Sequence, residues 1–465
     1  MYPCRTAFCS RQDPVQADHL LSLLCKIIFH CCTDAKRDSP RQPGVTHFGC
    51  DELKRVCMRA GQGAYIWAGV VVVRLVAVVG QLGNAIMTEV RAFGSNGNWQ
   101  LGLGHADDTI VPQTALVLPA GKAVKRVACG GNHSMLLLES GELYGCGSNA
   151  SGQLCDDLSV KAVPSWERVV SPGDDVLAAC VDIACGWEFS VVLDSHNGVW
   201  SRGSGPKGEL GLGEDVVRSD SWHKVMDAPR DAHVKLQTSF ENCVVVVTDA
   251  NGASSIAYGF GSNTKCQLGQ PKAKRVDTPA VVYRSDSHSI STAAMGKNFI
   301  VLVDSTGSIV HTSGAIPQSF DLTEWSQRSG LDVQAMWSSI YVLYEGRIYS
   351  YGFGVHGQIF DNDYYQEKIL GKHENAHICQ WTTGSEHGIM VVQSADVPGY
   401  SVYCWGWGEH GNCGRVDSDA NVADTSIIND YSNLTSKLNR VFVSDSNVPP
   451  RVFGGCASTW IVEYK

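Results

Sequence analysis

A glycine-rich unit returns along this chain at intervals close to fifty residues, and no other feature limits the possible folds so strongly. The unit is densest at residues 403–413, which read Tyr-Cys-Trp-Gly-Trp-Gly-Glu-His-Gly-Asn-Cys. One glycine taken from each copy gives the series Gly94, Gly147, Gly203, Gly261, Gly314, Gly354 and Gly408, with gaps of 53, 56, 58, 53, 40 and 54. A repeat of this length is typical of a solenoid, a propeller or an array.

A second unit lies between these glycines. Residues 127–138 and 183–193 show it most clearly, as a β-rich run, a glycine turn and then an apolar run of four or five residues. A tight turn follows, and a strand ending in Tyr or Trp leads back to the first unit. Each repeat therefore predicts four short strands, which is the content of one propeller blade.

The two ends of the repeat region complement each other. Residues 452–462 form the first half of a repeat without its second half, and residues 90–94 form a second half without its first. Joined, they make one blade and bring the count to seven. We therefore predict an all-β, seven-bladed propeller over residues 87–465, closed by strands from both ends so that no sheet edge stays open.

These motifs resemble the regulator-of-chromosome-condensation repeat family, whose members are seven-bladed propellers. Residues 93–97, 100–105, 261–268, 402–414 and 450–457 carry the resemblance and are most similar to a fungal branch of that family. The resemblance implies a non-catalytic subunit without a cofactor, paired as a heterodimer with a small CSL-type zinc protein. That pair serves diphthamide synthesis on elongation factor 2 and Elongator-dependent modification of wobble uridines in tRNA. Guanine-nucleotide exchange on a small GTPase, the activity of the founding member, is the alternative.

Charge bears on the class of partner. The chain has a net charge of −10, but residues 1–86 hold ten Lys or Arg and six Asp or Glu, so the repeat region carries −14. Such a surface opposes direct binding to nucleic acid, where neutralising phosphates supplies much of the affinity. We therefore expect protein partners without direct nucleic-acid binding, so the link to Elongator that the resemblance implies should be indirect. Membrane binding is not expected either.

The 18 cysteines do not indicate a disulfide scaffold. Cys129 and Cys185 hold equivalent repeat positions where a small buried residue is needed, and residues 87–465 contain no Cys-x-x-Cys pair. Reduced thiols of this kind indicate the cytoplasm, with the nucleus as a second location.

Two segments stand outside the repeat pattern. For residues 1–86 the favoured hypothesis is translated upstream or intronic sequence, with Met87 as the true initiator. The alternatives are a disordered or targeting extension, or a membrane anchor over residues 64–87, where Arg74 would cost about 2.5–3.5 kcal/mol. Residues 415–449, rich in Asp, Ser and Asn, predict a solvated loop insertion that adds no core strand.

Propellers bind partners through the loops of one face, and ten residues in the predicted loops are candidates for partner binding. They are Asn132, His133, Trp187, Glu188, Phe240, Lys297, Glu386, His387, Trp407 and His410. Trp187 and Phe240 are the stronger candidates because aromatic side chains dominate binding energy at interfaces. For His133 and His387 the favoured role is structural, bonding to neighbouring backbone in the turn.

The aromatic group near the end of the chain allows two interpretations. Alternation along a strand would put Trp405 and Trp407 on the same side, which favours packing between blades. His410 with Cys404 and Cys413 lacks the paired spacing of a zinc site, so we predict no metal there. No phosphate-binding loop or catalytic triad stands out, and the sequence predicts no catalytic residue.

Overall fold

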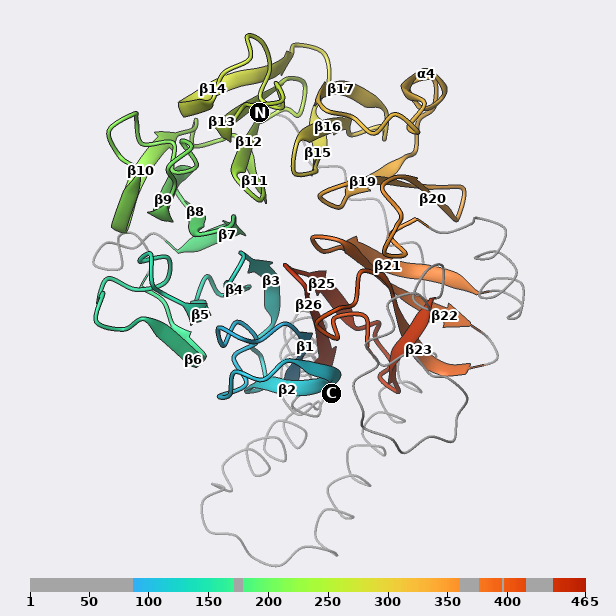
Figure 1. The fold of residues 1–465 in the computed structure, drawn as a ribbon. Coiled ribbons are helices and arrows are strands. Elements are labelled where there is room, and N and C mark those ends of the chain that lie inside the picture. The colour runs from blue at the N-terminus through green and yellow to red at the C-terminus, as the bar shows by residue number, and fades with distance from the viewer. Residues whose placement is uncertain (1–86, 171–178, 360–375, 395–396, 415–437) are drawn as a thin grey trace, which may run out of the picture. The chain divides into compact units, whose positions relative to one another are not determined.

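The computed structural model describes residues 87–170, 179–359, 376–394, 397–414 and 438–465, and they form seven β-sheets set in a ring (Figure 1). The sheets follow one another round the ring in chain order, so each sheet is one blade. The prediction of an all-β, seven-bladed propeller is confirmed. The hypotheses about residues 1–86 concern a segment outside the described residues.

The blades are numbered in chain order. The first contains β3 (Val124–Cys129), β4 (His133–Leu138), β5 (Leu143–Ser148) and β6 (Ala162–Arg168), and the second β7 (Cys180–Cys185), β8 (Phe189–Asp194), β9 (Gly198–Ser204) and β10 (Arg218–Asp227). The third contains β11 (His233–Ser239), β12 (Asn242–Thr248), β13 (Ser255–Ser262) and β14 (Arg275–Ser285). The fourth has β15 (Ile290–Met295), β16 (Phe299–Asp304) and β17 (Ile309–Gly314), followed by the short helix α4 (Leu322–Trp325). The fifth has β18 (Asp332–Ala335), β19 (Ser339–Tyr344) and β20 (Arg347–Gly352), and the sixth β21 (His377–Thr383), β22 (His387–Ser394), β23 (Val397–Gly406) and β24 (Asn439–Ser444).

The seventh blade closes the ring with strands from both ends of the repeat region, as predicted. Its order is β2 (Thr109–Leu118), β1 (Thr88–Gly94), β26 (Ser458–Tyr464) and β25 (Arg451–Gly454). Strands β1 and β26 pair antiparallel along their whole length, from Thr88 opposite Tyr464 to Gly94 opposite Ser458.

The hydrophobic core lies between neighbouring blades. The second strand of a blade is buried on both faces, and β4, β8 and β16 have no exposed position. One such cluster joins Val191 and Phe189 of the second blade to Val245 and Phe260 of the third. Burying a side chain of this size stabilises the fold by about 1.5–3 kcal/mol. Because these clusters lie between blades, each blade is stabilised by its contacts with both neighbours.

Each blade requires one glycine at the end of its third strand, where that strand passes the turn between the first and second strands. The φ angles of these glycines run from +87° at Gly314 to +129° at Gly352, and a Cβ at any of them would lie at most 2.6 Å from a backbone carbonyl oxygen. The sixth and seventh members of the series are Gly352 and Gly406, so the predicted Gly354 and Gly408 were wrong by two residues. Each of those two copies has two glycines that could align with the series. The strand pairing selects Gly352, opposite Ser339, and Gly406, opposite His387.

Two further expectations need correction. Within the stretch 415–449, residues 439–444 form β24, which pairs with β23 as the outer strand of the sixth blade. The apolar residues Val441 and Val443, two positions apart, are sufficient for an outer strand despite the polar residues around them. Residues 415–437 lie outside the described part. Blades four and five have three strands, not four, among the described residues.

Candidate functional site

Two sets of loops leave the propeller at the same end. Because the strands of a blade are antiparallel, the turn after the first strand and the loop after the third emerge together. We call this end the loop face. Its inner ring consists of the turns at residues 130–132, 186–188, 240–241, 296–298, 336–338, 384–386 and 455–457.

Backbone hydrogen bonds connect these turns from one blade to the next. The Gly131 N–H donates to the Trp187 carbonyl (2.9 Å), and the Trp187 N–H donates to the Phe240 carbonyl (2.8 Å). Farther round the ring, the Lys297 N–H donates to the Trp337 carbonyl (2.9 Å), and the Trp337 N–H to the Ser385 carbonyl (2.7 Å). These bonds fix the turns at the mouth of the central channel.

Three aromatic side chains meet at this mouth, although they belong to the second, third and fifth blades. The ring centroids of Trp187 and Phe240 lie 5.1 Å apart, those of Phe240 and Trp337 5.1 Å, and those of Trp187 and Trp337 5.9 Å. Phe240 adopts a φ of +51°, an unfavourable angle for a bulky residue that local packing must compensate. We call Trp187, Phe240 and Trp337 the aromatic trio.

A lysine lies directly on the trio. The Lys297 Nζ is 3.9 Å from the centroid of the Phe240 ring and 5.6 Å from that of Trp337. Among the described residues it forms no ion pair within 4.0 Å. Cation–π contacts of this kind contribute about 0.5–2 kcal/mol and hold the ammonium at the channel mouth, where it can meet an incoming anion.

Glu386 adds a partly buried carboxyl beside the trio. Its Oε2 accepts hydrogen bonds from Ser338 Oγ (2.7 Å) and Gln358 Nε2 (3.3 Å). Burial raises the pKa of Glu386 above its usual value, against the opposing effect of these donors. Lys297 and Glu386 thus give the mouth both signs of charge.

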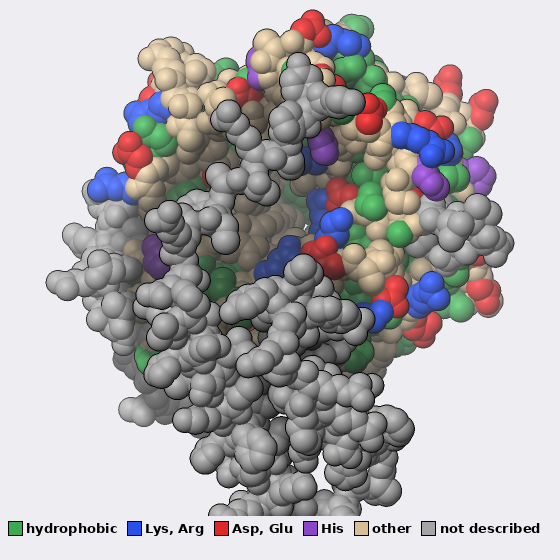
Figure 2. All heavy atoms as spheres, turned by 180° about the vertical axis from the view of Figure 1, so that it is seen from behind, with side chains coloured by type: hydrophobic (Ala, Val, Ile, Leu, Met, Phe, Trp, Pro, Cys, Tyr) green, Lys and Arg blue, Asp and Glu red, His purple; other side chains and the backbone are tan. Residues whose placement is uncertain are grey.

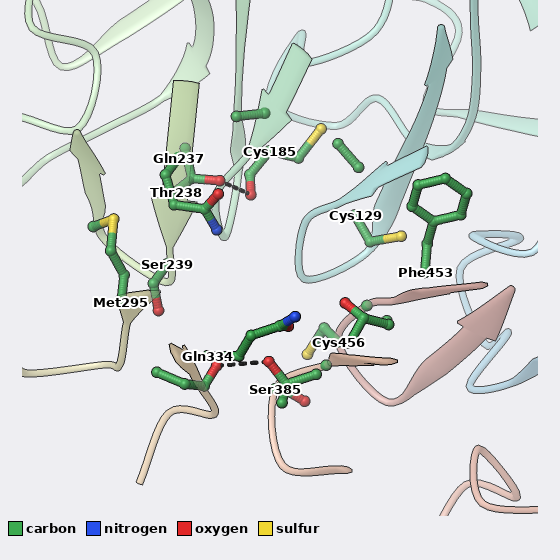
Figure 3. A pocket seen from close by; sticks show the side chains of 18 of the residues that line it. Cys129, Cys185, Gln237, Thr238, Ser239, Met295, Gln334, Ser385, Phe453 and Cys456 are labelled. Carbon is green, nitrogen blue, oxygen red and sulfur yellow. Dashed lines mark hydrogen bonds between the residues drawn. The ribbon is translucent and has the colours of Figure 1, made fainter. Parts of the chain in front are cut away.

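Behind the trio, the inner strands enclose a cavity of about 500 Å³. Figure 3 shows the thiols of Cys129, Cys185 and Cys456 among its lining side chains. Burial raises the pKa of Cys129 and raises that of Cys456 to about 11, so these thiols stay protonated and are poor nucleophiles. Within the described part of the chain, no cluster of three or more His, Cys, Asp or Glu side chains could hold a metal ion.

Charged side chains of both signs lie beside the central hollow (Figure 2). Of those lining the cavity, Arg126 donates through Nη1 to Asp182 Oδ1 (2.7 Å) and to the Leu236 carbonyl (3.2 Å). Arg451 donates to the carbonyls of Val124 (2.6 Å) and Lys125 (2.8 Å). Both arginines therefore connect blades through the channel wall.

Two of the candidate residues are core residues. His133 and His387 are fully buried, so they cannot contact a partner, and their inclusion as partner-binding residues was wrong. Their Nε2 atoms lie 2.9 Å from Ser190 Oγ and Thr459 Oγ1 of the following blades. The structural role holds, but the hydrogen-bond partners are hydroxyls of the next blade and not turn backbone. Burial lowers the pKa of His133 to about 3 and that of His387 to about 4.

The other candidates lie on the loop face. Glu188 and Trp187 are exposed, Trp187 at 37 %. Asn132 is half-buried and accepts a hydrogen bond from Asn98 Nδ2 at its Oδ1 (3.1 Å). With Phe240, Lys297 and Glu386 they form one group round the channel mouth, and their contact with a partner stays a prediction.

The two tryptophans of the sixth blade have different environments. Trp405 is buried and packs on Tyr341 of the fifth blade, as predicted (centroids 6.0 Å apart). Trp407 follows the end of β23, where Gly406 turns the chain, so the predicted position on one strand with Trp405 was wrong, although Trp407 does contact the neighbouring fifth blade. It is 37 % exposed and stacks on His356 (4.8 Å, 17°). His410 Nδ1 lies 2.8 Å from Asp108 Oδ2 of the seventh blade, away from the buried Cys404 and Cys413.

Trp337 was not among the site residues predicted from the sequence. It directly follows Met336, in the repeat position that Trp187 and Lys297 occupy in their own blades. That equivalence was a usable signal, although the worn repeat around Trp337 lacks the glycine that marks this turn in five of the other six blades. Phe353 and His356 were also missed.

Comparisons with known proteins agree with the propeller fold. The family description "Regulator of chromosome condensation (RCC1) repeat" matches residues 89–137 and 124–153. An RCC1 repeat-containing protein of Schizosaccharomyces pombe is 28% identical over 345 residues, which cover 70% of this chain and 89% of that protein. The secretion-regulating guanine nucleotide exchange factor of Bos taurus is 23% identical, over 70% of this chain and 75% of its own.

Two solved structures share the fold. Human WBSCR16 superposes with a TM-score of 0.61 at 16% identity, covering 81% of this chain and 98% of its own. Prp20p of Saccharomyces cerevisiae gives 0.59 at 16% identity, over 81% and 91% of the two chains. In the part of the chain that the structure describes, no helix has the length and hydropathy to cross a membrane.

Proposed function

This chain is a seven-bladed propeller built from RCC1-type repeats, and from that premise we propose that it is a non-catalytic subunit that binds a protein partner through the loop face. The observation that carries the proposal is the aromatic trio with Lys297 at the channel mouth. Aromatic side chains that are partly exposed and fixed in place are the residues from which interfaces gain most of their binding energy.

The proposed partner is the small CSL-type zinc protein. The resemblance of residues 402–414 and 450–457 to the fungal branch of the family supports this choice. The complex would serve diphthamide synthesis on elongation factor 2 and Elongator-dependent wobble-uridine modification, in the cytoplasm and nucleus. Lys297, held on two rings without an ion pair among the described residues, would meet a carboxylate of the partner.

Affinity capture tests the proposal. The full-length chain is used as bait for the recombinant zinc protein, and the dissociation constant is measured by calorimetry. Replacing Trp187 or Trp337 by alanine should weaken binding by more than about tenfold, a loss typical of an interface hot spot. Leu322→Ala is the matched control, because Leu322 is also 37 % exposed but lies on α4. Absence of a complex, or unchanged affinity in both tryptophan variants, would refute the proposal.

Guanine-nucleotide exchange is the second candidate, because one relative is named as an exchange factor. A nucleotide-release assay with the full-length chain and a panel of small GTPases separates the two functions. We expect no stimulated release. Robust release that Trp187→Ala leaves intact would favour the exchange function.

A further inference from the structure

We propose that the loop face carries a second docking surface, separate from the channel mouth, which binds a basic segment of a partner with bulky apolar side chains. It comprises residues 107–111, 353–356 and 407–411, from the seventh, fifth and sixth blades. We call it the acidic aromatic sector. The inference goes beyond the proposed function, since it concerns a different surface and a partner of different charge.

Large apolar side chains are concentrated and exposed in this sector. The exposed fractions are 51 % for Phe353, 64 % for Val355, 37 % for Trp407, 43 % for Ile110 and 51 % for Val111. Scattered apolar side chains on a surface need no explanation, but a contiguous group marks an interaction site.

Contacts between the loops make the group contiguous. The ring centroids of Phe353 and His356 lie 6.2 Å apart, and His356 stacks on Trp407 at 4.8 Å. In the same loop as Trp407, Gly411 approaches Ile110 so closely that a Cβ there would collide with the Ile110 side chain. The loops of three blades thus present one ordered surface.

Charge selects the occupant. The described loops 95–108, 353–359 and 407–414 contain no Lys or Arg, while Asp107, Asp108 and Glu409 are exposed. On the opposite side of the ring, loop 263–274 of the third blade carries three lysines and no acidic residue (Figure 1). Complementary charge steers association and rejects partners of like sign, so the sector favours Lys or Arg beside apolar side chains.

The two surfaces of the loop face therefore differ in charge composition, because the channel mouth holds charges of both signs and the described loops of the sector hold carboxylates without Lys or Arg. The channel mouth presents the Lys297 ammonium on the aromatic trio, whereas the sector presents carboxylates around Phe353 and Trp407. A partner that places a carboxylate on Lys297 gains no binding energy from the carboxylates of the sector, and the Lys297 ammonium repels a basic segment. Substitutions can therefore abolish binding at one surface without changing binding at the other.

A peptide selection tests the inference. Phage-displayed random dodecapeptides are selected on the full-length protein, and the enriched sequences are measured by fluorescence anisotropy. We expect enriched peptides to combine Lys or Arg with Trp, Phe or Leu. Their affinity should fall more than about tenfold in Trp407→Ala, fall in Asp107→Lys, and weaken with added salt. Phe353→Ser serves as a second apolar variant, and thermal melts establish that each variant is folded.

The controls separate this inference from the proposed function. Leu322→Ala should bind the selected peptides like the wild type, and Phe353→Ser should still capture the zinc protein. Selected peptides that are acidic or uncharged would overturn the inference. So would peptides whose affinity survives both Trp407→Ala and Phe353→Ser, or a self-association of the chain that these substitutions abolish.

Discussion

Glu209 gives the sharpest quantitative test of the repeat architecture. Glu209 lies in the loop after the third strand of the second blade. Four other blades have glutamine at the equivalent position, and the glutamine Oε1 accepts a hydrogen bond from the backbone N–H of the residue two places earlier. These bonds are Asn98 to Gln100 (2.8 Å) and Ser151 to Gln153, Lys265 to Gln267 and His356 to Gln358 (2.9 Å each). Glu209 Oε2 accepts from the Lys207 N–H in the same way (2.5 Å) and is only 5 % exposed.

The cost of placing a carboxyl there follows from its pKa. Burial raises the pKa of Glu209 from 4.5 to about 7, so the folded state favours the protonated form. Because this carboxyl ionises at lower pH in the unfolded chain than in the folded state, stability is lost as the pH rises from 4.5 through about 7. At about 1.4 kcal/mol for each pKa unit, the cost is about 3 kcal/mol near pH 8 and about 1 kcal/mol near pH 5.

Glu209→Gln removes this cost and keeps the hydrogen bond. Urea unfolding followed by tryptophan fluorescence should show the variant to be more stable, with an advantage that grows by about 2 kcal/mol between about pH 5 and pH 8. Glu214→Gln is the matched control in the same loop, because the Glu214 side chain is 80% exposed and loses only a surface ion pair with Arg275 (3.1 Å), so its replacement should change the stability little. An advantage that does not change with pH would refute the reasoning.

Two further predictions concern the fold. Gly261→Ala should lower the free energy of unfolding in urea by about 2–4 kcal/mol, because the φ of Gly261 is +113° and a Cβ there would strike a carbonyl oxygen. The control Gly97→Ala, where a Cβ would enter open space, should lower it by less than about 1 kcal/mol. His133 and His387 have lowered pKa values, so their contribution is present above about pH 6.5 and is lost as the pH falls toward 4. His133→Phe, which copies Phe189 of the second blade, should reduce this acid sensitivity; unchanged acid unfolding midpoints would contradict the assignment.

The sequence predicted those features that depend on local pattern. Glycine turns and apolar runs repeat within each blade, so the number of blades and the closure by two chain ends could be read directly. Contacts that a residue makes with a neighbouring blade could not be predicted from the sequence. The partner of His133 is Ser190, 57 residues away, and the alternation that should have packed Trp407 ends at Gly406. The aromatic trio joins three turns that only the curvature of the ring brings together.

The closing blade also sets an order of events during synthesis. Among the described strands, β1 is synthesised first and its partner β26 last, and Thr88 pairs with a residue 376 positions later, Tyr464. Until then the nascent chain exposes the inner edge of β1, which is a template for mispairing with other chains. The propeller can therefore reach its native topology only after β26 has been synthesised, and long-range closure of this kind predicts slow maturation.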